Sequence, residues 1–265
     1  MRMDFGMPTL IELKSLEENA ALCRELGLAF IEINMNMPEY QIDRLDRVRL
    51  AKTAEKYGIY FTIHLDENCN PSDFNERVAT VYTETVIEAI EVAKTLNIPV
   101  LNMHLSTGVY FTLPDKKIYL FEEYREEYLT RLKAFRNTCA TAIGDADIRI
   151  CVENCGDYAR AVFLKKGLDV LLESPAFGLT FAIGHNAAAG YGEESTILER
   201  ADRLLHFHVH DAEGTSHHLA LGDGDMELPQ YLQWANAHNC RAVLETKTVD
   251  ALRRSVAWLK EKGFR

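Results

Sequence analysis

The sequence predicts an α/β fold, and within that class a (β/α)8 (TIM) barrel built as a single domain over residues 1–265. Apolar β-prone runs alternate eight times with segments of helical periodicity. No linker or change of composition interrupts this alternation. Alternating βα units require a parallel sheet, and eight such units in one domain favour a closed barrel. An open doubly wound sheet is disfavoured because no G-x-G-x-x-G motif follows the first strand.

The predicted strands are short runs rich in β-branched residues. The stretch IRICVEN is typical, since Ile148, Ile150 and Val152 alternate with other residues and the run ends in Glu153. A glutamate at the end of a buried strand needs a partner, because burying an unpaired carboxylate is costly. The predicted strands are Met3–Met7, Leu28–Ile33, Ile59–Leu65, Ile98–His104, Ile148–Asn154, Gly178–Ile183, Leu204–His210 and Arg241–Glu245.

The predicted helices repeat apolar residues every three to four positions. Gly27 and Gly58 are the expected stops of the first two. Asp73 and Glu76 form a predicted capping box at the start of the third. The predicted helices are Leu13–Leu26, Asp43–Tyr57, Asp73–Leu96, Tyr119–Ile143, Lys165–Leu172, Glu194–Ala201, Leu228–Ala237 and Val249–Lys262.

Composition narrows the class of protein. Hydrophobic residues make up 47% of the chain, which indicates a globular protein. The net charge of −11 argues against a nucleic-acid partner, because phosphate binding rests on Lys and Arg. No run approaches the length of a membrane span, and the N-terminal stretch MRMDFGMPTL lacks the features of a signal peptide. The six cysteines have no zinc-finger spacing and are expected to be free thiols in a reducing cytoplasm.

Metal-type ligands gather where the predicted strands end. The carboxyl ends of barrel strands meet at one face, which is where active sites lie. Histidines and glutamates at the same end of several strands are hard to explain as satisfied core residues. Together they suit Zn²⁺, Mn²⁺ or Co²⁺ rather than Ca²⁺. In strand order, from the second strand on, the end residues are Glu32, His64, His104, Glu153, Ala182, His208 and Glu245.

These motifs give the chain a specific resemblance. It resembles the xylose isomerase-like TIM barrel superfamily, which joins sugar (phosphate) isomerases and epimerases with endonuclease IV. The motifs span residues 59–245, most of the chain. They are IHLD, NMHLS, VEN, A-I-G-H, HFHVHD, the LGDG loop and LE at the eighth strand.

The resemblance implies a metal site with one departure. The family takes its ligands from the fifth to eighth strands, which implies Glu153, position 182, His208 and Glu245. Position 182 is alanine where the family has aspartate. Two interpretations stay open: a natural divergence, with water completing the metal shell or the metal lost, or an engineered Asp→Ala change. Natural divergence is favoured because unmodified chains are the default.

The resemblance also implies a metal-dependent isomerase or epimerase acting on a keto sugar, impaired if Ala182 weakens the metal. Glu153 and Glu245 are the expected catalytic acid/base pair, since epimerisation beside a carbonyl needs two such groups and a Lewis acid. The expected partner is a small sugar or sugar phosphate. The expected substrate contacts are His64, His104, His185 and Glu32, with a structural ion pair the alternative for Glu32.

The sequence leaves other functions open. An endonuclease IV-like hydrolase would have a D-x-H motif after the seventh strand, where this chain has Ser216 and His218. With serine at 216 and alanine at 182, two of the carboxylates expected in its three-zinc cluster are missing. A related lyase or C-glycoside-cleaving enzyme and a non-catalytic sugar-binding barrel are the remaining alternatives. The identity of the sugar and metal, and association into a homo-oligomer, are left open.

Three weaker candidates complete the analysis. His206 is expected to be a packing residue on the seventh strand, and His217 is expected to be solvated. The tight loop from Gly222 to Gly224 is a candidate nest that presents backbone N–H groups to a phosphate.

Overall fold

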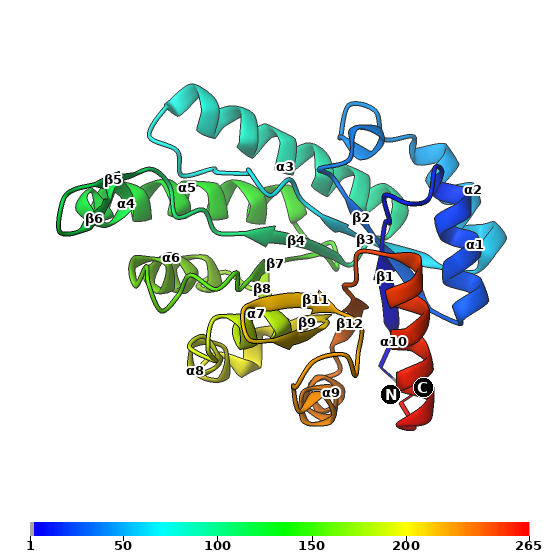
Figure 1. The fold of residues 1–265 in the computed structure, drawn as a ribbon. Coiled ribbons are helices and arrows are strands. Elements are labelled where there is room, and N and C mark those ends of the chain that lie inside the picture. Colours follow the sequence, from blue (N-terminus) through cyan, green and yellow to red (C-terminus); the bar gives the residue numbers. More distant parts are fainter. Residues whose placement is uncertain (1–2, 265) are drawn as a thin grey trace.

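Eight parallel strands close into a barrel in the computed structural model, which describes residues 3–264 (Figure 1). Each strand pairs with the next along the chain, and the last pairs with the first to close the ring. The predicted (β/α)8 barrel is therefore confirmed. The barrel strands are β1 (Phe5–Pro8), β2 (Phe30–Asn34), β3 (Tyr60–His64), β4 (Val100–His104), β7 (Arg149–Glu153), β8 (Phe177–Ala182), β9 (Leu204–Val209) and β12 (Arg241–Leu244).

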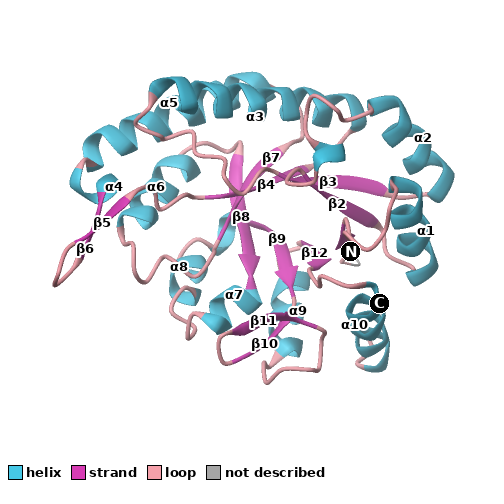
Figure 2. Cartoon of the chain, turned by 45° about the horizontal axis from the view of Figure 1, so that its top comes forward, coloured by secondary structure: helices cyan, strands magenta, loops and turns pink. Residues whose placement is uncertain are grey.

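Helices surround the strands, as Figure 2 shows. Among the described residues no helix is both long and apolar enough to cross a bilayer. All six cysteines are free thiols, as predicted. The helices are α1 (Leu16–Leu26), α2 (Arg47–Tyr57), α3 (Glu76–Leu96), α4 (Leu120–Glu123), α5 (Arg125–Ile143), α6 (Phe163–Leu172), α7 (Ile183–Ala188), α8 (Glu194–Leu198), α9 (Leu228–Ala237) and α10 (Val249–Glu261).

Local sequence signals set most helix ends. Gly27 and Gly58 end α1 and α2 in the left-handed region, with φ of 77° and 65°, as predicted. The predicted capping box of α3 is wrong. Asn75 is the N-cap, and its side chain accepts from the backbone N–H of Arg77. Asp73 lies two residues before the N-cap and accepts from the backbone N–H of Asn75, so its carboxylate is too early in the chain to cap the helix.

Two predicted loops contain short antiparallel hairpins. Both lie beyond the carboxyl ends of barrel strands, one after β4 and one after β9. Strands of three or four residues carry too little alternation to be recognised by pattern. The hairpin strands are β5 (Tyr110–Thr112) with β6 (Lys117–Tyr119), and β10 (Asp211–Glu213) with β11 (Ser216–Leu219).

Two helices also differ from the prediction. The single helix expected over 119–143 is broken at Tyr124, whose ψ of 46° separates α4 from α5. The helix α7 was not predicted, because the glycines and alanines of its sequence give no amphipathic stripe. It begins directly after Ala182 and carries His185.

Strand residues alternate between the barrel interior and the helices. The outward set is apolar; Phe181, for example, has no exposed surface and packs edge-on against Phe207, Tyr231 and Trp234. The inward set near the carboxyl ends is polar and equally buried. Its deeper members are Glu32, Thr62, Asn102, Thr180 and His206. Thr62 and His206 bond Glu32 in this interior, whereas Thr180 Oγ1 and Asn102 Oδ1 have no hydrogen-bond partner among the described residues.

Replacing Phe181 by alanine should lower the free energy of unfolding by about 3–5 kcal/mol, because it leaves a cavity between β8, β9 and α9. Chemical denaturation measures the loss. The matched control is Val162→Ala, which removes a side chain with 59% of its surface exposed and should cost little. Equal losses in the two variants would contradict this packing.

Candidate active site

The predicted strand-end residues converge at the carboxyl end of the barrel. His64, His104 and Glu153 are the last residues of β3, β4 and β7. His208 is the penultimate residue of β9, and Glu245 directly follows β12. The side chain of His104 is 20% exposed, whereas Glu153 and His208 are buried. The structure thus brings together ligands that are separated by up to about 180 residues in the chain.

One oxygen of Glu153 faces β3 and β4. Its Oε2 accepts a hydrogen bond from Asn102 Nδ2 at 2.5 Å and lies 3.1 Å from His104 Nε2. His64 Nε2 lies 3.5 Å from the same oxygen. Asn102 was not predicted. It lies two residues before His104 on β4. Residues two apart on a strand point to the same face, so this spacing could have identified Asn102 as a neighbour of the site.

The other oxygen of Glu153 faces β9 and α7. Its Oε1 lies 3.1 Å from His208 Nδ1 and 3.3 Å from His185 Nδ1. His208 Nδ1 is also 3.3 Å from Glu245 Oε2, so this ring nitrogen stands between two buried carboxylates. None of these contacts to His208 has hydrogen-bond alignment, and Glu245 Oε2 has no hydrogen-bond partner among the described residues. An oxygen of each glutamate therefore lies within 3.3 Å of His208 Nδ1.

Glu245 also faces the outer rim of the site. Its Oε1 lies 2.8 Å from Lys247 Nζ and 3.3 Å from His218 Nε2. The lysine is 56% exposed, so this ion pair is largely solvated.

Glu32 lies deeper than the other acidic residues, with 2% exposure. Its Oε2 accepts from Thr62 and contacts His206 Nε2, both at 3.0 Å. Its Oε1 lies 2.7 Å from His208 Nε2. His206 is fully buried and packs against Phe30, in line with the expected packing role, and its ring also contacts this carboxylate. The substrate contact predicted for Glu32 stays a prediction, with both its oxygens already engaged by protein groups.

Burial and neighbouring charges shift the pKa values of these groups in opposite directions. Burial alone would raise the pKa of the Glu153 carboxyl, but His208 and His104 hold that pKa well below its usual range. Burial alone would lower the pKa of His208, but Glu153, Glu32 and Glu245 raise it well above its usual value. Burial opposes the charge of His64 too, and contact with Glu153 raises its pKa to about 9. Contact between the carboxylates and the histidines thus favours the charged form of both partners.

The chemistry of the donors fits a divalent transition metal. Two carboxylates and an imidazole converge, and the buried Nδ1 of His208 and Oε2 of Glu245 lack hydrogen-bond partners within residues 3–264. An oxygen of Glu153, an oxygen of Glu245 and a nitrogen of His185 all lie within 4.8 Å of one another. Nitrogen and oxygen ligands in this number suit zinc, manganese or cobalt.

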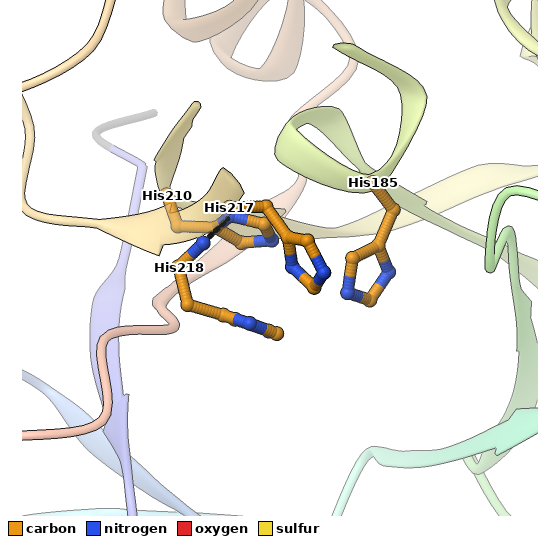
Figure 3. A group of neighbouring side chains, drawn as sticks. All are labelled: His185, His210, His217 and His218. Atoms are coloured by element: carbon orange, nitrogen blue, oxygen red, sulfur yellow. Dashed lines mark hydrogen bonds between the residues drawn. The ribbon is translucent and has the colours of Figure 1, made fainter. Parts of the chain in front are cut away.

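A second group of four histidines adjoins the first (Figure 3). His185 comes from α7, His210 follows β9, and His217 and His218 lie on β11. The backbone N–H of His218 donates to His210 Nδ1 at 2.8 Å, so the neutral His210 carries its proton on Nε2 and is a poor ligand. The other three rings can offer a nitrogen to an ion. His217 was expected to be only solvated. It is exposed, yet its ring centroid lies 4.9 Å from that of His185.

The loop that holds LGDGD is organised around one buried acid, Asp211. Its carboxylate accepts from the backbone N–H groups of Gly222 at 2.9 Å, Gly224 at 3.0 Å and Met226 at 3.3 Å. The prediction that this loop presents its N–H groups to a phosphate is therefore wrong. Those donors are already satisfied inside the protein.

Two cavities flank the site. A small one of about 120 Å³ is bordered by Glu32, Asn34, His64, Glu245 and Lys247. A larger, more open one of about 450 Å³ lies on the other side. It is bordered by Cys155, Gly156, Arg160, His185, Ala188 and His217. Of the convergent residues, Glu245 and His64 can thus be reached from the small cavity and His185 from the large one.

Comparison with known proteins agrees with this architecture. The family model of the xylose isomerase-like TIM barrel matches residues 20–262. An uncharacterized protein of Methanocaldococcus jannaschii is 25% identical over 194 residues, which is 69% of this chain and 62% of that protein. The chain therefore spans less than two thirds of the length of this curated relative.

Solved structures share the fold. A D-tagatose 3-epimerase-like protein superposes with a TM-score of 0.79 at 24% identity, covering 98% of this chain and 96% of its own. The IOLI protein with a bound zinc atom superposes with a TM-score of 0.73 at 16% identity, covering 97% of each chain. At these identities the likeness establishes the fold.

Replacing His64 by glutamine should remove a pH-dependent part of the stability of the metal-free protein. The folded pKa of His64 is raised to about 9 from an ordinary 6.5. Its protonated form therefore stabilises the fold fully below about pH 6.5, and this contribution is lost as the pH rises through about 9. Urea unfolding at about pH 6 and about pH 9.5 should show the wild-type advantage shrinking by up to about 3 kcal/mol. His238→Gln, at the end of α9, is the control. An advantage of His64 that does not change with pH would contradict this assignment.

Proposed function

The chain belongs to the xylose isomerase-like TIM barrel family, and from this premise we propose that it is a metal-dependent isomerase or epimerase of a keto sugar or close relative, acting as one domain. One observation carries the proposal. Glu153 and Glu245, from different strands, each place an oxygen within 3.3 Å of His208 Nδ1, which has no hydrogen-bond partner among the described residues. The D-tagatose 3-epimerase-like protein of the same fold supports the reaction class.

The proposed metal ligands are Glu153, His208 and Glu245. Zinc, manganese and cobalt all suit this set, and the zinc in the IOLI neighbour supports a divalent ion. When bound, the ion would act as a Lewis acid that stabilises the enediolate oxygen. Ala182 stands where the family has an aspartate. It is paired in register with His208 on β9, so a carboxylate at 182 would lie beside that ring.

The proposed proton transfer uses the two glutamates. From β7 to β12 is three strand steps of eight, which places their strands about 135° apart around the barrel axis. The two carboxylates can therefore approach a substrate from different sides. One glutamate, as the carboxylate, takes the proton beside the carbonyl. The other, in its carboxylic acid form, delivers a different proton to the opposite face, and the two exchange these roles in the reverse reaction.

His64, His104 and His185 are proposed to orient the sugar hydroxyls. Their rings surround Glu153 and remain in reach of the cavities, since His64 borders the small cavity and His185 the large one. Each ring has a nitrogen that can donate to or accept from a hydroxyl. Holding the reacting carbon between two fixed carboxylates supplies the orientation that proton transfer needs.

Replacing Ala182 by aspartate should tighten binding of Zn²⁺ or Mn²⁺ by about tenfold or more, since even groups that only support a ligand are worth about 10–100-fold in affinity. Titration calorimetry measures the dissociation constant in both proteins. Ala188→Asp, which adds a carboxylate to the wall of the large cavity instead, is the matched control and should change it little. The same affinity in wild type and Ala182→Asp would remove position 182 from the metal shell.

Deuterium incorporation tests the reaction. The metal-loaded Ala182→Asp protein in D₂O should introduce deuterium beside the carbonyl of at least one ketose, free or phosphorylated. Glu153→Gln and Glu245→Gln should each abolish it, whereas Glu213→Gln, in the hairpin β10–β11, should not. No exchange with any ketose while metal is bound would overturn the proposal in favour of a lyase or a sugar-binding barrel.

A further inference from the structure

Glu193 is a fully buried carboxylate outside the group of metal-type ligands. It lies between α7 and α8 and has no exposed surface. Within the described part of the chain it forms no ion pair with Lys, Arg or His. Its charge is met instead by three N–H groups: Asn154 Nδ2 at 2.9 Å, and the backbone N–H groups of Gly156 and Tyr158, both at 2.8 Å. Burying an unpaired carboxylate is costly, so these three N–H donors are what stabilises Glu193 in the protein interior.

The partners of Glu193 lie in the loop that leaves β7 directly after Glu153. Two backbone N–H groups of that loop and one side chain converge on one carboxylate. On its own side, the backbone N–H of Glu193 donates to Asn186 Oδ1 at 3.1 Å. Asn186 belongs to α7, the helix that carries His185. Glu193 therefore ties the loop after β7 to α7.

Asn154 extends this tie to β8. Its Oδ1 accepts from the backbone N–H of Ala182 at 2.8 Å, and its Nδ2 donates to the carbonyl of Ala182 at 3.0 Å. Its own carbonyl lies 3.2 Å from His185 Nδ1. A carbonyl only accepts, so His185 carries its proton on Nδ1 and keeps the lone pair on Nε2. The position of Asn154 thus sets the end of β8, and its carbonyl and the neighbouring Glu153 Oε1, 3.3 Å from the same nitrogen, together favour the Nδ1–H tautomer of His185.

We propose that Glu193 is a positioning residue of the active site, which holds the loop after Glu153 against α7 and thereby aims Glu153 and fixes the Nδ1–H tautomer of His185. The same tie forms a wall of the larger cavity, which is bordered by Gly156 from the loop and by His185 and Ala188 from α7. This proposal rests on the proposed function only for the statement that the residues form an active site. The positions of the loop and of the His185 proton do not depend on that function.

The isosteric change Glu193→Gln tests the role. Glutamine keeps the shape but replaces one accepting oxygen by an NH₂ group, which then faces a backbone or amide N–H donor. The neighbouring Glu194→Gln is the matched control, because Glu194 accepts from Tyr231 and Asn186, and no hydrogen bond or ion pair joins its side chain to the described loop after β7.

Two readouts separate positioning from general stability, and neither uses a substrate. In ¹⁵N NMR of the metal-free protein, His185 should carry its proton on Nδ1 in wild type and in Glu194→Gln, and should become a mixture of tautomers in Glu193→Gln. Affinity for Zn²⁺, measured by calorimetry well below the unfolding temperature, should fall about 10–100-fold in Glu193→Gln only.

Each possible result of these two measurements either supports or overturns the positioning role of Glu193. An unchanged His185 tautomer in Glu193→Gln, with only a lower melting temperature, would make Glu193 a structural residue and overturn the proposal. Equal effects in the two variants would overturn it as well. If the wild type bound no Zn²⁺, the metal-dependent function would fail, and the tautomer measurement would still decide the role of Glu193.

Discussion

The constraint on which the site depends is the burial of three glutamates within one barrel mouth. Glu32, Glu153 and Glu245 each have 7% or less of their surface exposed, and an isolated buried carboxylate is not tolerated. Each is compensated by histidines on neighbouring strands, and His208 touches all three. The inward positions of β3, β4 and β9 are therefore occupied by polar residues, where a barrel interior would otherwise be filled by branched aliphatic side chains.

This constraint also explains why the backbone around the site is held by buried acids that are not ligands. Asp211 gathers the N–H groups of the loop that follows β11, and Glu193 gathers those of the loop that follows β7. Backbone donors in these loops need acceptors once they leave water, which apolar packing does not supply. A carboxylate bonded to several N–H groups fixes a loop by directional bonds.

The barrel and the ligand-bearing strand ends could be predicted because both follow from local periodicity. Alternation in IRICVEN marks a strand, and parallel βα units force the strand ends to one face, so Glu153 and His208 meet although they are far apart in the chain. Asn102 and His210 followed the same inward spacing and could have been found by it. Glu193 could not, because nothing in GYGEEST distinguishes a buried acid from its neighbour Glu194. Only the folded loop brings the backbone of Gly156 and Tyr158 to it.

The alanine at position 182 changes the charge balance of the site rather than its shape. The backbone N–H and carbonyl of Ala182 are held by Asn154 whatever side chain it carries, so the end of β8 stays in place. An aspartate there would add a fourth acidic group beside His208. With alanine, contact with Glu153 still raises the pKa of His208 and of His64 against the effect of burial. In the proposed metal site His208 would give up its proton to bind an ion, so the residue at position 182 would influence the competition between a proton and a cation for that ring nitrogen.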